Sequence, residues 1–198
     1  MHATGDCKRI AVYGGSFNPP HICHQLILLY VLETQLIDEI VLVPCYRHAF
    51  EKGQTLAPYE FRRRWCEALI APFGSRCSIS DVEREMGGES RTIDTMKEFE
   101  RRNPKARFSL VLGSDIRSER KKWKNFEDLE KNYPIIWIGR QEHDWEPGDP
   151  LVLPDISSRR LRKALSEGKS VEGLIPTRVL ASIRESEWSW KKDPVKSA

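Results

Sequence analysis

Two histidines that follow a glycine pair are the residues of this chain best suited to chemistry. In the segment IAVYGGSFNPPHICHQ, an apolar run ends at Gly14 and Gly15, and two prolines lead into an apolar stretch that starts with His21 and His24. Two imidazoles three residues apart in the first turn of a helix face the same way. The N–H groups at a helix N-terminus attract phosphate. The segment therefore predicts a strand, a phosphate-binding turn and a helix that presents two imidazole donors.

Other interpretations of this segment are less specific. A glycine pair can form an ordinary turn, and histidines early in a helix can be capping or surface residues. A metal site is a third alternative, but no carboxylate or further histidine stands nearby at ligand spacing. The segment has neither the Gly-Lys-Ser/Thr of a Walker A loop nor a G-x-G-x-x-G dinucleotide fingerprint. We therefore expect a phosphate site, with no metal ion held by the protein.

A second set of residues with phosphate-binding chemistry stands near the other end of the chain. Ser157 and Ser158 open a predicted helix directly after LVLPDI, and Arg162 follows one turn later. A serine in this position caps the helix. Its hydroxyl, the helix N–H groups and a guanidinium can also converge on a triphosphate. We expect both roles.

Apolar segments of strand and helix type alternate along the chain. The sequence predicts strands at residues 10–13, 39–43, 78–82, 108–112, 134–138 and 151–153, and helices at 21–36, 58–71, 90–102, 157–167 and 176–185. This alternation predicts a single α/β domain, with a Rossmann-like, doubly wound and mostly parallel sheet and helices on both faces. Ligands of such sheets bind beyond the carboxyl ends of the strands. The glycine pair, Gly113 and Asp115 are all expected at such ends.

Composition sets limits on the class of protein. The 198 residues are 39% hydrophobic and 31% charged, with a net charge of +3, which gives no argument for nucleic-acid binding. The five cysteines are odd in number and scattered, as in reduced cytoplasmic proteins. We find no signal peptide and no stretch long enough to cross a membrane. We expect one domain over residues 1–190 and a frayed tail at 191–198.

These motifs resemble those of a known enzyme superfamily. The first segment is similar to the GG-[ST]-F-[DN]-P-x-H-x-x-H signature of the nucleotidyltransferases, and ISSRRLR is similar to the I-S-[ST]-x-x-[IL]-R signature of their adenylyltransferases. Gly113 and Asp115, followed by Trp123, resemble the bacterial nicotinate mononucleotide adenylyltransferases, and the resemblance extends over residues 8–190. The chain departs from the family at Cys23, where glycine is common, and at Arg159, where threonine is usual. It also departs in VPCYRHAFEKG, where the family carries a Pro-His-Lys loop.

The resemblance implies an enzyme of NAD biosynthesis. It would join ATP and nicotinate mononucleotide to give deamido-NAD and pyrophosphate, with Mg²⁺ carried by the ATP. Three alternatives stay open: the acceptor is nicotinamide mononucleotide, the acceptor is another phosphorylated molecule such as phosphopantetheine, or the protein is a non-catalytic nucleotide-binding regulator. A homo-oligomer is also left open.

The resemblance also implies roles for individual residues. Charge stabilisation at the phosphates falls to His21, His24 and Arg162. ATP contacts are expected from Gly14, Gly15, Ser16, Phe17, His21, His24, Gly113, Asp115, Ile156, Ser157, Ser158 and Arg162. Mononucleotide contacts are expected from Ser16, Phe17, Arg47, His48, Lys52, Thr92, Trp123 and Arg140. In the family, the residue at the position of Trp123 lies beside the pyridine ring, on which an indole can stack. Trp123 can alternatively cover an edge of the core.

Overall fold

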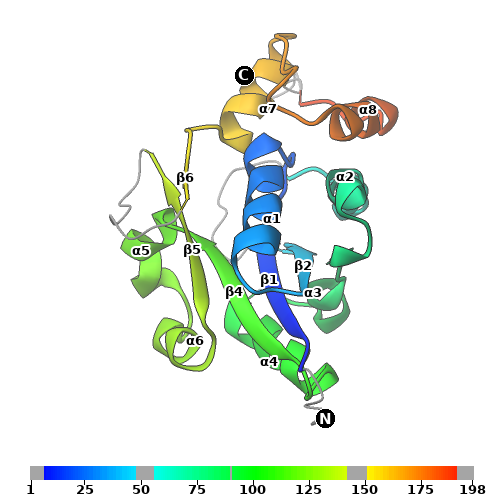
Figure 1. Cartoon of the computed structure of the whole chain (residues 1–198). Helices are drawn as coiled ribbons and strands as arrows, with labels where there is room; N and C mark the ends of the chain where they lie inside the picture. Colours follow the sequence, from blue (N-terminus) through cyan, green and yellow to red (C-terminus); the bar gives the residue numbers. More distant parts are fainter. Residues whose placement is uncertain (1–6, 48–55, 90, 142–150, 191–198) are drawn as a thin grey trace.

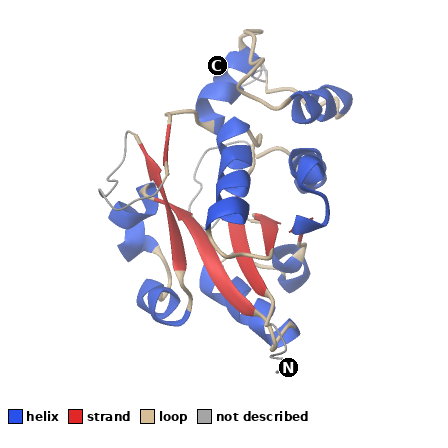
Figure 2. Ribbon diagram, viewed as in Figure 1, coloured by secondary structure: helices blue, strands red, loops and turns tan. Residues whose placement is uncertain are grey.

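One parallel sheet forms the centre of the protein (Figures 1 and 2). The computed structural model describes residues 7–47, 56–89, 91–141 and 151–190. Within these, six strands are ordered β3-β2-β1-β4-β5-β6, and every neighbouring pair is parallel. The strands are β1 (Arg9–Gly15), β2 (Glu39–Pro44), β3 (Cys77–Ile79), β4 (Arg107–Gly113), β5 (Ile135–Arg140) and β6 (Val152–Leu153). The predicted α/β, Rossmann-like fold is confirmed.

Helices cover both faces of this sheet (Figure 2). They are α1 (Ile22–Thr34), α2 (Tyr59–Ile70), α3 (Val82–Met86), α4 (Thr92–Arg102), α5 (Asp115–Glu119), α6 (Phe126–Asn132), α7 (Ser158–Ser166) and α8 (Thr177–Glu185), with 3-10 turns at Ala71–Arg76 and Arg120–Lys122. Residues of β1 alternate between two apolar clusters. Ala11 and Tyr13 pack with α1, α2 and α8, whereas Ile10 and Val12 pack with α4 and α6. This period of two is what a strand buried on both faces requires.

Three short helices were not expected from the sequence. Helices α3, α5 and α6 have only five, five and seven residues, too few to show a clear helical period. The predicted strand at 78–82 is wrong at its end, because Asp81 precedes α3 and Val82 is its first residue. The buried Val82 packs with Ile93 and Met96 of α4, so tertiary packing explains its apolar character. The expected frayed tail at 191–198 lies outside the described residues.

Helix α1 begins directly after His21 and carries His24, and its buried side chains anchor it to the sheet. Leu28 and Val31 are completely buried against the sheet, while Leu29 on the outer side is 49% exposed. The helix begins directly after the turn that follows β1, so its first residues stand at the carboxyl edge of the sheet. No helix of the described residues has the length and apolar character needed to span a lipid bilayer.

Substitution of the neighbouring residues Leu28 and Leu29 distinguishes the effect of burial on stability from that of helix propensity. We expect Leu28→Ala to lower the free energy of unfolding by about 2–5 kcal/mol, because it removes a buried side chain and leaves a cavity. Leu29→Ala should change it by less than about 0.5 kcal/mol. Urea denaturation followed by circular dichroism measures both. Equal losses would show that α1 does not pack on the sheet as described.

Candidate active site

The carboxyl ends of three adjacent strands open into one cleft. Gly14 and Gly15 end β1, Gly113 ends β4 and Arg140 ends β5, and all of them line a cavity of about 390 Å³. The starts of α4 and α7 complete its walls. The two central strands β1 and β4 lie side by side, and their connections leave on opposite faces. A cleft at that position is where open α/β sheets bind their ligands.

Most of the residues predicted from sequence come together in this cleft. Its lining includes Gly14, Gly15, Ser16, Phe17, His21, His24, Thr92, Gly113, Asp115, Trp123, Arg140, Ser157 and Ser158. They come from segments far apart in the chain, so their meeting is a property of the fold. The lining also joins residues of the proposed phosphate end with Thr92 and Trp123, as the resemblance implied.

Three other predicted residues, all described, lie outside this lining. Ile156 lines a smaller neighbouring cavity, which it shares with the two histidines and Arg140. Arg162, in the second turn of α7, donates from one guanidinium nitrogen to the carbonyl oxygen of Asn18 at 2.7 Å. Arg47 is exposed, with its guanidinium 5.5 Å from the centre of the Tyr46 ring. His48 and Lys52 lie outside the described residues.

The two histidines form one hydrogen-bonded unit at the start of α1. The backbone N–H of His21 donates to Nδ1 of His24 at 3.0 Å, and the two ring centroids are 3.9 Å apart. A nitrogen that accepts a hydrogen bond carries no proton, so a neutral His24 ring has its proton on Nε2. His24 can therefore act as a donor through Nε2 while its other nitrogen fixes the ring.

Burial keeps both rings neutral. Burial, and then the positive charge of Arg140, lowers the pKa of His21 to about 3. Burial, the adjacent His21 and Arg140 likewise hold the pKa of His24 well below its usual value. In this structure the imidazoles are therefore uncharged N–H donors. Among the cleft-lining residues, positive charge comes from Arg140.

Ser114 positions Arg140 by joining the ends of β4 and β5. This fully buried serine accepts a hydrogen bond from the backbone N–H of Arg140 at its hydroxyl (3.0 Å), and its own N–H donates to Ile138 (2.8 Å). The Arg140 Nε then lies 3.5 Å from a carboxylate oxygen of Asp115. A Cβ on Gly113 would stand 2.2 Å from that oxygen, so only glycine permits this approach. Sequence reasoning selected Gly113 and Asp115 but missed Ser114.

Gly15 has a comparable steric role beneath the histidines. A Cβ there would lie 3.2 Å from the Phe17 ring, which is tighter than ordinary contact. Phe17 is buried, adopts a positive φ of 45°, and packs with ring centroids 5.5 Å from Tyr13 and 5.2 Å from His24. The glycine thus makes room for an aromatic ring that supports His24.

Glu83 is a cleft residue that sequence reasoning did not select. One of its carboxylate oxygens accepts from the backbone N–H of Tyr46 (3.1 Å) and the other from the Thr95 hydroxyl (3.3 Å). It therefore connects the segment after β2 with helix α4, whose first residue is Thr92. The acidic run VEREM contains Glu83, but these partners are known only from the fold.

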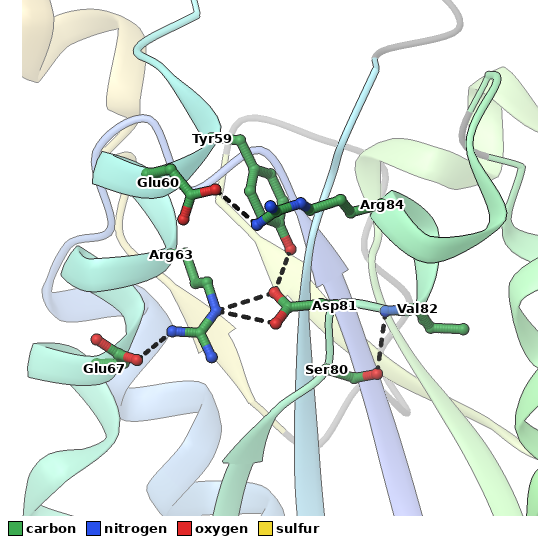
Figure 3. A network of polar contacts seen from close by, with 8 residues as sticks. All are labelled: Tyr59, Glu60, Arg63, Glu67, Ser80, Asp81, Val82 and Arg84. Atoms are coloured by element: carbon green, nitrogen blue, oxygen red, sulfur yellow. Dashed lines mark hydrogen bonds and ion pairs between the residues drawn. The ribbon is translucent and has the colours of Figure 1, made fainter.

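A polar network holds α3, and with it Glu83, against α2 (Figure 3). Asp81 accepts from the Tyr59 hydroxyl at 2.7 Å and from the Arg63 Nε at 2.9 Å, and Arg84 donates to Glu60 at 2.6 Å. Burial raises the pKa of Asp81, but the hydrogen bonds from Tyr59 and Arg63 outweigh it and leave the pKa below its usual value. The carboxylate is thus stabilised as the acceptor at the centre of this network.

Comparison of the sequence with known proteins gives consistent matches over most of the chain. The cytidylyltransferase-like family matches residues 12–164. A protein of Anaeromyxobacter dehalogenans (strain 2CP-C), described as a probable nicotinate-nucleotide adenylyltransferase, is 39% identical over 179 residues, which cover 89% of this chain and 94% of the relative. A protein of Myxococcus xanthus with the same description is 35% identical over 177 residues, which cover 89% and 92%.

Solved structures show the same fold. A Plasmodium falciparum nicotinic acid mononucleotide adenylyltransferase complexed with NaAD superposes with a TM-score of 0.75 at 22% identity, covering 90% of this chain and 96% of that one. A putative nicotinate-nucleotide adenylyltransferase from Vibrio parahaemolyticus gives a TM-score of 0.67 at 22% identity, covering 89% and 99%.

The buried neutral histidines predict a dependence of stability on pH. Unfolded imidazoles take up protons as the pH falls below 6.5, whereas His21 in the folded protein does so only near pH 3. Protonation therefore favours unfolding in that interval, and stability should fall by up to about 1.4 kcal/mol per pH unit for each buried histidine. Urea denaturation between pH 7 and pH 5 should give a steeper loss for the wild type than for His21→Gln. Equal slopes would show that His21 titrates normally in the folded protein.

Proposed function

The chain belongs to the cytidylyltransferase-like family and, within it, to the nicotinate-nucleotide adenylyltransferases, and from this premise we propose how its cleft joins ATP and nicotinate mononucleotide. The products are deamido-NAD and pyrophosphate. The observation that carries this proposal is the single cleft in which the histidine pair and the two serines of α7 meet Thr92 and Trp123. That arrangement suits the phosphates and the pyridine ring of a joined dinucleotide.

The reaction needs alignment and charge stabilisation more than proton transfer. A phosphate oxygen of the mononucleotide forms a bond to the α-phosphorus of ATP, and the bond from that phosphorus to the bridging oxygen of pyrophosphate breaks. The attacking phosphate is already anionic near neutral pH, so no general base is required. Catalysis then comes from holding the two phosphates in line and from stabilising the charge that spreads over the phosphoryl oxygens.

Residues of the cleft divide this work. The buried neutral histidines donate N–H hydrogen bonds to phosphate oxygens, and Ser157, Ser158 and the N-terminus of α7 add further donors. Arg140 supplies positive charge from the end of β5. Arg162 donates to the Asn18 carbonyl of the turn, and we assign its positive charge to the departing pyrophosphate.

Magnesium enters this scheme as part of the ATP substrate. The proposed phosphate end offers mainly imidazole, hydroxyl and guanidinium groups, which suit anions, whereas Mg²⁺ prefers carboxylate oxygens and water. The Asp115 carboxylate at this end lies 3.5 Å from the Arg140 Nε. In the described ranges no group of three or more histidine, cysteine or acidic residues could hold a metal ion. We therefore place the ion on triphosphate oxygens and water, where it neutralises part of their charge.

The ring end lies between α4 and the segment after α5. Trp123 offers an indole face for the pyridine ring, and Thr92 stands at the N-terminus of the eleven-residue helix α4. Backbone N–H groups and the positive end of that helix can receive the ring carboxylate of nicotinate. Arg47, His48 and Lys52 remain predictions for the same substrate. We also propose one domain over residues 1–190 and a reducing, cytoplasmic location, which fits five free cysteines.

The choice of acceptor tests the proposed function directly. Pyrophosphate release from ATP should be fastest with nicotinate mononucleotide, and its kcat/KM should exceed that of the nicotinamide form about tenfold or more. An amide would leave a buried N–H donor unpaired, at a cost on the order of 1–3 kcal/mol. Phosphopantetheine should give no release above background. An equal or inverted ratio for the two mononucleotides would make the acid-specific assignment wrong, and release with phosphopantetheine alone would overturn the proposal.

The role of the histidine pair is tested by His24→Ala. Loss of one donor to a transition-state phosphate oxygen typically costs about 2–4 kcal/mol, so kcat should fall by roughly two to three orders of magnitude. Gln25→Ala, the next residue of α1, is the matched control and should stay within about twofold of the wild type. Near-normal turnover of a folded His24→Ala variant would remove His24 from the phosphate site.

Trp123→Ala tests the stacking role at the ring end. The stack is worth about 1 kcal/mol, so KM for the mononucleotide should rise about fivefold with little change in KM for ATP. Trp137→Ala is a matched control, because both indoles pack on Phe126, with ring centroids 5.9 Å and 6.5 Å away, but only Trp123 lines the cleft. Identical kinetic effects of the two substitutions would assign Trp123 to packing.

A further inference from the structure

Arg62 is a charged side chain buried in the interior beside the cleft. It lies in the first turn of α2 and is only 1% exposed. A guanidinium is almost never buried to this degree unless its donors are paired. Arg63, its neighbour, reaches Asp81 near the surface, and Arg64 is exposed. Only Arg62 of this arginine run is directed inward.

Two backbone carbonyls accept hydrogen bonds from Arg62. The Arg62 Nε donates to the oxygen of Ala57 at 2.9 Å, and a terminal nitrogen donates to the oxygen of Ser16 at 2.9 Å. Ala57 in turn donates its N–H to the side-chain oxygen of Asn18 at 3.1 Å. Arg62 and Asn18 therefore join the turn after β1 to the start of α2, across 46 and 39 residues of chain.

The bond to Ser16 fixes a peptide unit that needs external support. Phe17 has a φ of 45°, a region that bulky residues adopt only when their surroundings hold them there. In a trans peptide the N–H of one residue points opposite to the carbonyl of the residue before it. By holding the Ser16 carbonyl toward α2, Arg62 turns the Phe17 N–H away from α2. It also fixes the Phe17 ring that supports His24.

An arginine is not what packing alone would select at this position. The same face of α2 carries the fully buried residues Trp65, Cys66 and Leu69, so an apolar side chain would be compatible with the core. Replacing buried ionic groups by apolar ones is often neutral for stability, whereas a buried charge carries a desolvation penalty. The presence of arginine at position 62 is therefore explained by the geometry that it imposes on the turn, and not by a gain in stability.

We propose that Arg62 is a positioning residue for the phosphate-binding turn. It touches no substrate; it holds the Ser16–Phe17 peptide so that the turn and the histidine pair are already arranged for the phosphates of ATP. This inference rests on the proposed function, because it names a residue that prepares the same cleft for the same reaction.

The test compares Arg62→Met and Arg62→Lys with Arg64→Met as the control on the same helix. Displacing a catalytic group by about 1 Å can cost a hundredfold in rate, so we expect Arg62→Met to lower kcat about tenfold to a hundredfold. KM for ATP should rise about fivefold. KM for the mononucleotide should rise less, because its expected contacts at Ser16 and Phe17 are displaced but those at Thr92 and Trp123 are not. Arg62→Lys retains the charge but not the planar fork, and should lie between Arg62→Met and the wild type. Arg64→Met should match the wild type.

Two further measurements separate positioning from general stability. Thermal unfolding shows which variants are folded, and if Arg62→Met does not fold, Arg62→Lys decides the question. Calorimetric titration with ATP alone should give weaker binding for Arg62→Lys than for Arg64→Met. The proposal is overturned if the folded variants keep wild-type kcat and ATP binding, or if both KM values rise equally with a lowered Tm. If the wild type releases no pyrophosphate with any mononucleotide, the proposed function fails, and the ATP titration still decides the role of Arg62.

Discussion

The turn between β1 and α1 cannot satisfy its own carbonyl groups, and much of the site is built around that constraint. Pro19 and Pro20 have no N–H, so the turn is short of donors for local hydrogen bonds. The donors come from helices elsewhere: Arg162 bonds to Asn18 at 2.7 Å, and Ser158 to Pro19 at 2.9 Å. Arg62 does the same for Ser16. The prolines thus make the phosphate-binding turn dependent on the packing of α2 and α7 around it.

This construction suits a site that works by preorganisation. The turn, the histidine pair and Arg140 are each held in place by hydrogen bonds from neighbouring groups. The His24 ring is oriented by the backbone of His21, and Arg140 is positioned by Ser114. Burial lowers the pKa of both imidazoles, so in this structure they act as neutral, oriented hydrogen-bond donors. Fixed dipoles stabilise a transition state without reorganising during the reaction, which explains why so many buried groups surround one small cleft.

The sequence predicted those parts of the protein whose signal is local. The sheet and the long helices follow from apolar period and from breaks at glycine and proline, and the histidine pair from the order of residues within one segment. Helices α3, α5 and α6 were missed because five to seven residues carry little periodicity. Glu83 and Arg62 were missed for a different reason. Their partners, Tyr46 and Ser16, lie 37 and 46 residues away and can be identified only after the chain has folded.

The contacts from α7 to the turn between β1 and α1 also determine when the site forms during folding. Ser158 and Arg162 reach back across 139 and 144 residues, from α7 to the turn between β1 and α1. Contacts of such long range close late, since the entropy of the intervening chain must be overcome before they form. A growing chain that has emerged only as far as β5 already contains the glycine and histidine pairs. It still lacks the contacts from α7 that hold their turn in place. Assembly of the nucleotide site is therefore tied to the synthesis of α7, and a chain that has emerged only as far as β5 would lack it.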